Sequence, residues 1–262
     1  MQSLFDFSDS TFRYEPYPIA MAKNVLSPEI YSEMLESWPE TERFLYMPNL
    51  GHKYSLSEVN NAREYKDVVT SVPIWKRVHE EVKSEQFIHG VLDWLIKKNV
   101  DLGFRKNCVV TNKPSLNLLS RLKEAYRGAA LLGSRVSPLR SRFEFSILPG
   151  DGGSIRPHTD APTKFITLVL AMVEPGKWKK EYGGDTAVVW PKDPTRTYNF
   201  ANSYLEFDEV NELESFQFDA NQCLIFVKTY NSWHSVKPIT APDASTLRKT
   251  LTINIEAPRG WI

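Results

Sequence analysis

The spacing of hydrophobic and polar positions changes along the chain near residue 140. Before it, apolar residues recur every three or four positions, which is the period of a helix with one buried face. Three segments show this period, at residues 27–39, 74–82 and 86–98, and residues 114–132 form a fourth candidate. We therefore expect a mainly helical N-terminal part, at about residues 1–135.

The first of these helices has a clear start and a clear end. Ser27 offers a capping hydroxyl, and Pro28 follows at the first helical position, where its missing N–H costs nothing. Ile30 and Met34 then lie on one face at helical spacing. Pro39 is expected to end the helix.

The second part alternates like strands with one face in a core. Phe143, Phe145 and Ile147 alternate with the other residues of 143–148. Further short strands are expected at residues 165–173, 186–190, 215–218, 223–227 and 251–255. Turn clusters separate them, and no βαβ alternation or phosphate-binding glycine pattern occurs. The pattern predicts a mostly β sandwich or jelly roll over about residues 140–258, within a single domain spanning 1–262.

Composition excludes several classes of protein. The chain has 262 residues with 32 basic and 32 acidic side chains, and this balance argues against a nucleic-acid-binding protein. No apolar run reaches the roughly 20 residues of a membrane helix, and the N-terminus lacks the pattern of a secretory signal. Two cysteines, Cys108 and Cys223, are too few for a disulfide framework or a thiolate zinc cluster. We expect a cytoplasmic protein that binds neither membrane nor nucleic acid; the sequence leaves its oligomeric state open.

Two histidines and one aspartate form the candidate chemistry. His158 and Asp160 are two residues apart, so on an extended segment both side chains point the same way. His234, from a distant strand, would complete a set of two imidazoles and one carboxylate, the arrangement that holds non-haem Fe(II) with open positions. The His-x-Asp pair alone is more typical of a surface histidine beside a turn carboxylate.

An arginine follows at the start of the last expected strand. Arg248 can reach into the mouth of a barrel and bind a carboxylate through two parallel N–H bonds. Thr250, two residues on, faces the same side and offers a hydroxyl. The plainer alternative is a surface arginine paired with an acidic neighbour.

Taken together and in this order, these residues resemble the Fe(II)/2-oxoglutarate-dependent dioxygenase superfamily, and most closely its prolyl-4-hydroxylase-like branch. The resemblance rests on His158-x-Asp160, His234 followed by Val236 and Pro238, and Arg248-x-Thr250. Smaller matches are Pro149-Gly150, the stretch 183–186 (Gly-Gly-Asp-Thr) and the apolar stretch 224–226. The resemblance covers about residues 140–257. The N-terminal helices are similar to those that buttress the barrel in such enzymes.

The resemblance implies a fold and a set of roles. The fold is a double-stranded β-helix, a cupin-like jelly-roll barrel buttressed by α-helices. Fe(II) is held by His158, Asp160 and His234, and 2-oxoglutarate binds through Arg248 and Thr250. Many relatives carry a tyrosine before the first histidine; none stands here, so Thr167 or Asn254 is expected to contact the co-substrate instead. Lys249 is an alternative partner for the carboxylate, but strand alternation turns it away from the face of Thr250.

The implied activity is hydroxylation of an unactivated C–H bond, with 2-oxoglutarate and O2 converted to succinate and CO2 and with ascorbate as a supporting reductant. The intact Asp160 favours hydroxylation or desaturation over halogenation, because halogenating relatives lack this carboxylate. The expected substrate is a small polar metabolite, a sugar-containing molecule, an amino acid or a peptide. The alternatives are a non-catalytic jelly-roll ligand-binding protein and a cupin-type isomerase or hydrolase, which usually has more histidines.

Overall fold

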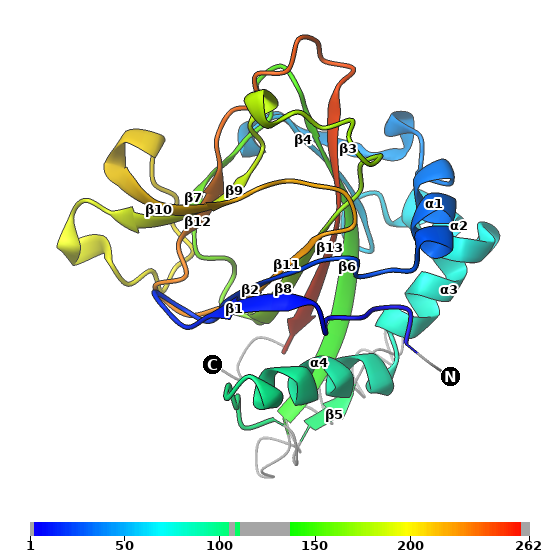
Figure 1. Ribbon diagram of the computed structural model, residues 1–262, viewed down its shortest axis with the longest axis horizontal. Coiled ribbons are helices and arrows are strands. Elements are labelled where there is room, and N and C mark those ends of the chain that lie inside the picture. The colour runs from blue at the N-terminus through cyan, green and yellow to red at the C-terminus, as the bar shows by residue number, and fades with distance from the viewer. Residues whose placement is uncertain (1–2, 105–107, 111–136, 258–262) are drawn as a thin grey trace.

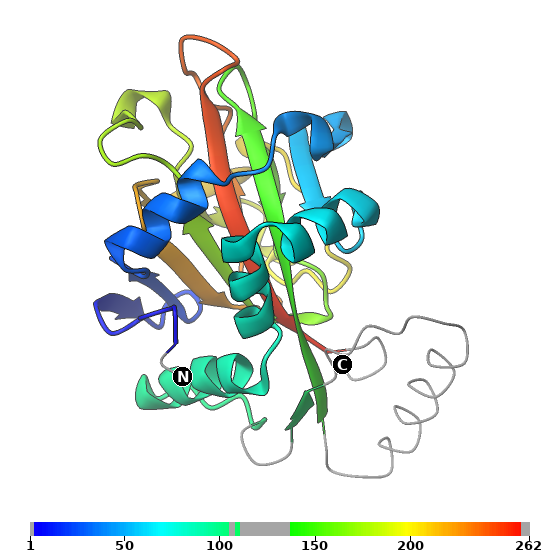
Figure 2. The same ribbon diagram turned by 90° about the vertical axis from the view of Figure 1, so that its right-hand side faces the viewer.

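The computed structural model describes residues 3–104, 108–110 and 137–257 (Figures 1 and 2). Over this part of the chain it contains two β-sheets and four α-helices. The helices are α1 (Pro28–Glu36), α2 (Ala62–Ser71), α3 (Pro73–Val82) and α4 (Glu85–Lys97). No helix in the described ranges is long and apolar enough to cross a membrane.

The larger sheet has nine strands, in the order β1-β2-β11-β8-β13-β6-β4-β3 with β5 paired to β6. They are β1 (Ser10–Arg13), β2 (Ile19–Ala22), β3 (Leu45–Met47), β4 (Lys53–Ser57), β5 (Cys108–Val110), β6 (Ser137–Pro149), β8 (Lys164–Ala171), β11 (Cys223–Val227) and β13 (Leu247–Glu256). Only the β5–β6 pair is parallel; the other pairs are antiparallel.

The smaller sheet has four strands in the order β10-β9-β12-β7, all antiparallel. They are β7 (Ile155–His158), β9 (Thr186–Pro191), β10 (Val210–Phe216) and β12 (His234–Val236). The two sheets face each other without closing at their edges (Figure 1). This arrangement confirms the expected mostly β, jelly-roll class with supporting helices.

The helices cover the outer face of the larger sheet, as Figure 2 shows for α1, α2 and α3 across β6 and β13. Alternation along β6 decides which side chains meet them. Phe143, Phe145 and Ile147 are fully buried in the core shared with the helices. Their neighbours Glu144 and Ser146 point to the other side, between the two sheets, where strand alternation places them.

Phe145 lies at the centre of this core. Its ring makes edge-to-face contacts with Trp75 at 4.6 Å and Trp38 at 5.4 Å between centroids. Phe145→Ala is expected to lower the free energy of unfolding by about 3–5 kcal/mol, because it removes this contact area and leaves a cavity. Urea denaturation measures the change. Phe200→Ala, at a side chain 65% exposed, is the matched control and should change stability by less than about 0.5 kcal/mol.

The three expected helices that lie within the described residues are all present in the structure. The segments at 27–39, 74–82 and 86–98 correspond to α1, α3 and α4, and the Ser27 hydroxyl accepts a hydrogen bond from the Ile30 backbone N–H as an N-cap does. The candidate helix at 114–132 lies outside the described residues.

The expectation of a mainly helical N-terminal part was wrong in one respect. Strands β1 to β4 also come from it and extend the larger sheet on both sides. Each has only three to five residues, so none shows enough alternation to be recognised. Their backbones pair with strands far along the chain, such as β2 with β11 and β4 with β6.

Candidate metal centre

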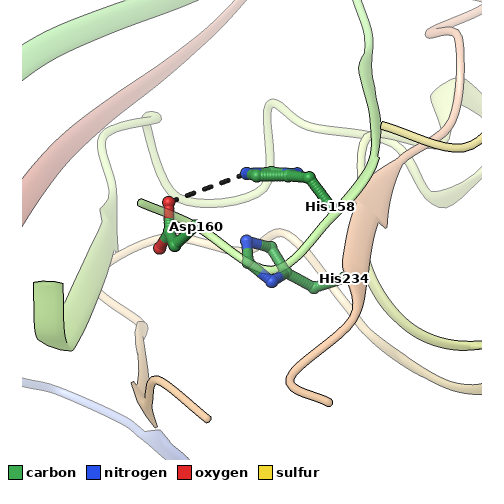
Figure 3. A group of neighbouring side chains, drawn as sticks. All are labelled: His158, Asp160 and His234. Atoms are coloured by element: carbon green, nitrogen blue, oxygen red, sulfur yellow. Dashed lines mark ion pairs between the residues drawn. The ribbon is translucent and has the colours of Figure 1, made fainter. Parts of the chain in front are cut away.

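The three candidate ligands meet on the inner face of the smaller sheet (Figure 3). His158 ends β7 and His234 begins β12, and the ladder between these strands places the two residues directly opposite each other. Their ring centroids are 4.4 Å apart. One ligand atom from each histidine and one from Asp160 all lie within 4.8 Å of one another. All three side chains are buried, so the arrangement is a preformed set of donors.

The backbone around Asp160 differs from the sequence expectation. The expected extended segment ends at His158, and Asp160 adopts a left-handed conformation with φ +68°. Aspartate tolerates this region better than most residues. The turn still brings Asp160 Oδ1 to 3.7 Å from His158 Nε2. Convergence of the two side chains was therefore predicted correctly, but for the wrong backbone geometry.

Both imidazoles are oriented by the backbone. His158 Nδ1 lies 2.9 Å from the carbonyl oxygen of Arg156, and His234 Nδ1 lies 2.9 Å from that of Ser232. A carbonyl oxygen only accepts, so each Nδ1 carries the proton and donates. The lone pair of each ring is then on Nε2, which leaves it available for a metal ion.

Burial and nearby charge prepare the protonation states that a metal ion needs. Burial, with the neighbouring His158, lowers the pKa of His234 to about 3, so this imidazole is neutral at physiological pH. For Asp160, burial raises the pKa, but the nearby Lys164 ammonium and the two histidines outweigh it and hold the pKa well below its usual range. The carboxylate is therefore ionised.

Two further side chains hold the Asp160 carboxylate. The Thr167 hydroxyl lies 2.9 Å from Asp160 Oδ2 and 3.2 Å from Asn254 Oδ1. The Lys164 ammonium lies 2.6 Å from Asp160 Oδ1. Sequence reasoning missed Lys164; its spacing of four residues from Asp160 was a visible signal, but it could not be interpreted without the turn between them.

Arg248 lines the same cavity and is only 4% exposed. Its Nε donates to the Gly184 carbonyl oxygen at 2.6 Å and its Nη2 to the Thr186 hydroxyl at 3.2 Å. Its guanidinium also stacks 4.5 Å from the centroid of Phe218. Burial lowers the pKa of Arg248 to about 10, so it remains charged at neutral pH.

Gly184 makes room for this arginine. A Cβ at Gly184, which has φ +79°, would lie 2.9 Å from the Trp178 ring and 3.2 Å from Arg248 Cδ. The Gly183-Gly184 pair noted in the sequence therefore shapes the Arg248 pocket. Thr186, from the same stretch, is a contact that sequence reasoning did not assign.

No carboxylate of the described residues lies within ion-pairing distance of Arg248. A buried arginine without an acidic partner is costly unless an anionic ligand completes it. The cavity that it shares with the metal ligands has a volume of about 220 Å³. Ser146 and Thr250 also line it, and so does the Ser235 hydroxyl, which is buried and has no partner in the described part of the chain.

The remaining sequence candidates are placed as follows. Thr250 lies on the cavity wall, as expected from its spacing to Arg248. Thr167 also lines the cavity, but its hydroxyl points to Asp160. Lys249 projects to the opposite face of β13, where its ammonium lies 5.9 Å from the Trp38 ring, so it is not a partner for a ligand in this cavity.

The C-terminal part of the chain, which forms the smaller sheet and four strands of the larger one, matches a known family. Residues 143–256 match the family described as the 2OG-Fe(II) oxygenase superfamily, and they include every ligand candidate described above. These residues therefore form a domain of this superfamily. A search of curated protein sequences finds no match to this oxygenase.

Solved structures share its fold. A prolyl 4-hydroxylase from Phytophthora capsici is 14% identical over 92% of this chain and 59% of its own, with a TM-score of 0.50. A Pseudomonas putida prolyl-4-hydroxylase is 12% identical over 92% of both chains, with a TM-score of 0.45. The epimerase SnoN from nogalamycin biosynthesis is 15% identical over 91% of this chain and 78% of its own, with a TM-score of 0.49.

The donor set of this oxygenase fits the groups that its superfamily implies. Two imidazoles and one carboxylate suit six-coordinate Fe(II), because they leave positions open for other ligands. The unpaired Arg248 and the unpartnered Ser235 hydroxyl, in the same cavity, suit a small dicarboxylic acid such as 2-oxoglutarate.

Proposed function

We propose that this oxygenase is an Fe(II)- and 2-oxoglutarate-dependent hydroxylase of a small molecule. In this proposal His158, Asp160 and His234 hold Fe(II), and Arg248 binds the distal carboxylate of 2-oxoglutarate. When bound, the metal supplies the activation of O2 that is coupled to decarboxylation of 2-oxoglutarate. The observation that carries the proposal is the preformed His-Asp-His cluster, which shares one cavity with a buried arginine. Among the described residues this arginine has no carboxylate within ion-pairing distance, and only the more distant Asp185 interacts with it electrostatically.

The chain's own groups perform binding and orientation. The carbonyl oxygens of Arg156 and Ser232 fix the two imidazoles with Nε2 toward Asp160. Arg248 is itself held by Gly184 and Thr186, so its free N–H groups are aimed before any ligand arrives. Thr250 and Ser146 face each other across β13 and β6 and offer hydroxyls on the cavity wall. Ser146 thus stands on the strand where many relatives carry a tyrosine.

Thr167 is proposed as a positioning residue for Asp160 rather than as a direct contact of the co-substrate. Thr167→Val keeps the shape of the side chain but removes its hydrogen bond to Oδ2. We expect a loss of metal affinity of about 10–100-fold, as for other groups that orient a ligand. Thr167→Ser retains the hydroxyl and should bind like the wild type. Titration with Mn(II), followed by the paramagnetic resonance signal of the free ion, measures both.

The substrate is proposed to be a small molecule or the end of a peptide. The cavity of about 220 Å³ is smaller than the roughly 300–1,000 Å³ of pockets that enclose drug-sized ligands. The Trichoplax adhaerens prolyl hydroxylase, which was solved with a peptide fragment, is 14% identical to this chain with a TM-score of 0.45. At this similarity only the fold is shared, so the size of the cavity guides the proposed substrate class.

Succinate formation tests the proposal. Purified protein is incubated with Fe(II), ascorbate, O2 and 2-oxoglutarate, alone and with candidate substrates, and succinate is measured. Succinate that depends on both the metal and the protein supports the proposal. If 2-oxoglutarate neither binds the metal-loaded protein nor yields succinate with any substrate, the proposed hydroxylase activity is wrong.

A further inference from the structure

The wall of the cavity carries more basic than acidic side chains. Its described lining includes Lys53, Arg156, Lys164 and Arg248, but only one acidic residue, Asp160. Two of these cations are paired with carboxylates beyond the lining, Lys53 with Glu144 and Arg156 with Glu206. The other two exceed Asp160 by one positive charge, and the charges of a bound Fe(II) and of 2-oxoglutarate would cancel. The loaded cavity would therefore keep one positive charge in excess, which attracts an anion.

Exposure separates these cations by depth. Arg248 is 4% exposed, and the proposed function assigns it to 2-oxoglutarate. The side chains of Lys164 and Lys53 are 18% and 22% exposed, and that of Arg156 is 41% exposed. The two lysines are therefore more accessible than the buried arginine, so they can be reached by a second ligand.

Lys164 forms its ion pair with Asp160, one of the three candidate metal ligands. Its ammonium lies 2.6 Å from Asp160 Oδ1, which is also the carboxylate oxygen 3.7 Å from His158 Nε2. A cation held by these ligands would lie close to the Lys164 ammonium and would repel its charge. In the described part of the chain Lys164 forms no other ion pair, so loading the site leaves a partly buried ammonium that needs another anion.

Lys53 is placed to share that anion. It pairs with the buried Glu144 at 2.5 Å, and Glu144 also interacts electrostatically with Lys164. The four groups therefore alternate in charge across the cavity, from Lys53 through Glu144 and Lys164 to Asp160. If a metal ion binds Asp160, the negative charge of that carboxylate no longer balances Lys164, and the row has one unbalanced positive charge.

The mouth offers a surface for the rest of such a ligand. Tyr204 is 37% exposed and stacks on the His158 ring, with 5.5 Å between centroids and 25° between planes. The Arg156 guanidinium lies 5.0 Å from the Tyr204 centroid. Asn202 also lines the cavity, and its side-chain oxygen is buried without a hydrogen-bond partner in the described ranges. The mouth therefore combines an aromatic face with an unused acceptor.

We propose that the primary substrate is a small anion, whose carboxylate or phosphate group is bound by Lys164 with Lys53, and whose body lies against Tyr204 and Asn202. This inference rests on the proposed function, because it assumes that Asp160 serves the metal ion and Arg248 serves 2-oxoglutarate. It narrows the substrate from any small polar molecule to an acid or a phosphate ester.

Three simple probes test the proposal on the full chain loaded with Mn(II) and saturating 2-oxoglutarate under anaerobic conditions. They are benzoate, phenyl phosphate and the neutral benzamide, and calorimetry measures their dissociation constants. At least one anion should bind about tenfold more tightly than benzamide, as expected for a charge-assisted contact in a partly buried site. Whichever anion binds better identifies the source of the charge. Equal binding of all three probes, or no measurable binding of either anion, overturns the proposal.

Variants assign the effect to the lysine. Lys164→Met should lose the preference for the anion, and Lys164→Arg should restore most of it. Lys66→Met removes one charge from an exposed position on α2, across the larger sheet, and should change nothing. If Lys164→Met keeps the full preference while its thermal unfolding matches the wild type, the assignment is wrong.

A second variant covers the case in which Lys164→Met does not fold. The double variant Lys53→Gln, Glu144→Gln removes the neighbouring ion pair without leaving either charge unpaired. It should weaken binding of the preferred anion severalfold and leave benzamide unchanged. Binding of 2-oxoglutarate is titrated separately, in the wild type and in each variant. If the wild type does not bind 2-oxoglutarate, the proposed function is contradicted. If the wild type binds 2-oxoglutarate but shows no preference for an anionic probe, only the proposed substrate class is contradicted.

Discussion

Asp160→Ala is expected to abolish metal binding and succinate formation together. The substitution removes the only carboxylate of the three-ligand cluster and leaves two imidazoles, which cannot complete a facial set. The loss of Mn(II) affinity should exceed the roughly 10–100-fold that substitution of an orienting group costs. Paramagnetic resonance of free Mn(II) measures the affinity, and chromatography measures succinate.

Two controls separate this effect from misfolding. Asp160→Asn keeps the size of the side chain and an oxygen for the Thr167 hydroxyl, so it should fold like the wild type but bind metal poorly. Asp67→Ala removes a carboxylate from the exposed surface of α2 and should bind Mn(II) normally. Wild-type affinity in Asp160→Ala would show that the metal ion, if any, lies elsewhere.

Arg248→Met is expected to weaken 2-oxoglutarate binding by roughly thirtyfold to a thousandfold. Loss of one partner from a buried, hydrogen-bonded charge pair costs about 2–4 kcal/mol, which corresponds to this range. Methionine retains apolar contact with Phe218, and burial of the arginine is itself unfavourable, as its lowered pKa indicates. The free energy of unfolding should therefore change little.

A shortened co-substrate makes the test specific for the distal carboxylate. 2-Oxobutyrate has the 2-oxo acid group of 2-oxoglutarate but lacks the carboxylate proposed to bind Arg248. The wild type should bind 2-oxoglutarate far more tightly than 2-oxobutyrate, and Arg248→Met should bind the two with similar, weak affinity. Lys249→Met, on the opposite face of the same strand, is the matched control. Discrimination retained in Arg248→Met would place the distal carboxylate at another residue.

The candidate site shows how far spacing along the chain can be interpreted. His158, Asp160 and His234 were predicted to converge, and they do, because antiparallel pairing of β7 with β12 places the two histidines opposite each other. Arg248 and Thr250 were predicted to share a face of one strand, and both line the cavity. The prediction for Arg248 and Thr250 succeeded because strand alternation is a local property, whereas Asp160 reaches the cluster through a left-handed backbone conformation that alternation does not describe.

Residues that act through contacts between distant segments were not predicted. Thr186 at the start of β9 and Gly184 in the loop before it hold Arg248, and Ser146 faces Thr250 only through the register of β6 with β13. The left-handed backbone at Asp160, where Lys164 lies against the carboxylate, was also not predicted by the strand pattern. None of these contacts has a signature in local sequence, because each depends on which strands become neighbours.

The sequence by itself determined the class of fold, the main helices and the identity of the residues around the candidate metal centre. Periodicity and side-chain chemistry are local properties of the chain, so they can be recognised before it folds. Only the tertiary structure decided which cations share the cavity, which of them lack partners, and how deep each lies. Burial and charge pairing arise from the packing of two sheets and their covering helices, so they exist only once distant strands have met.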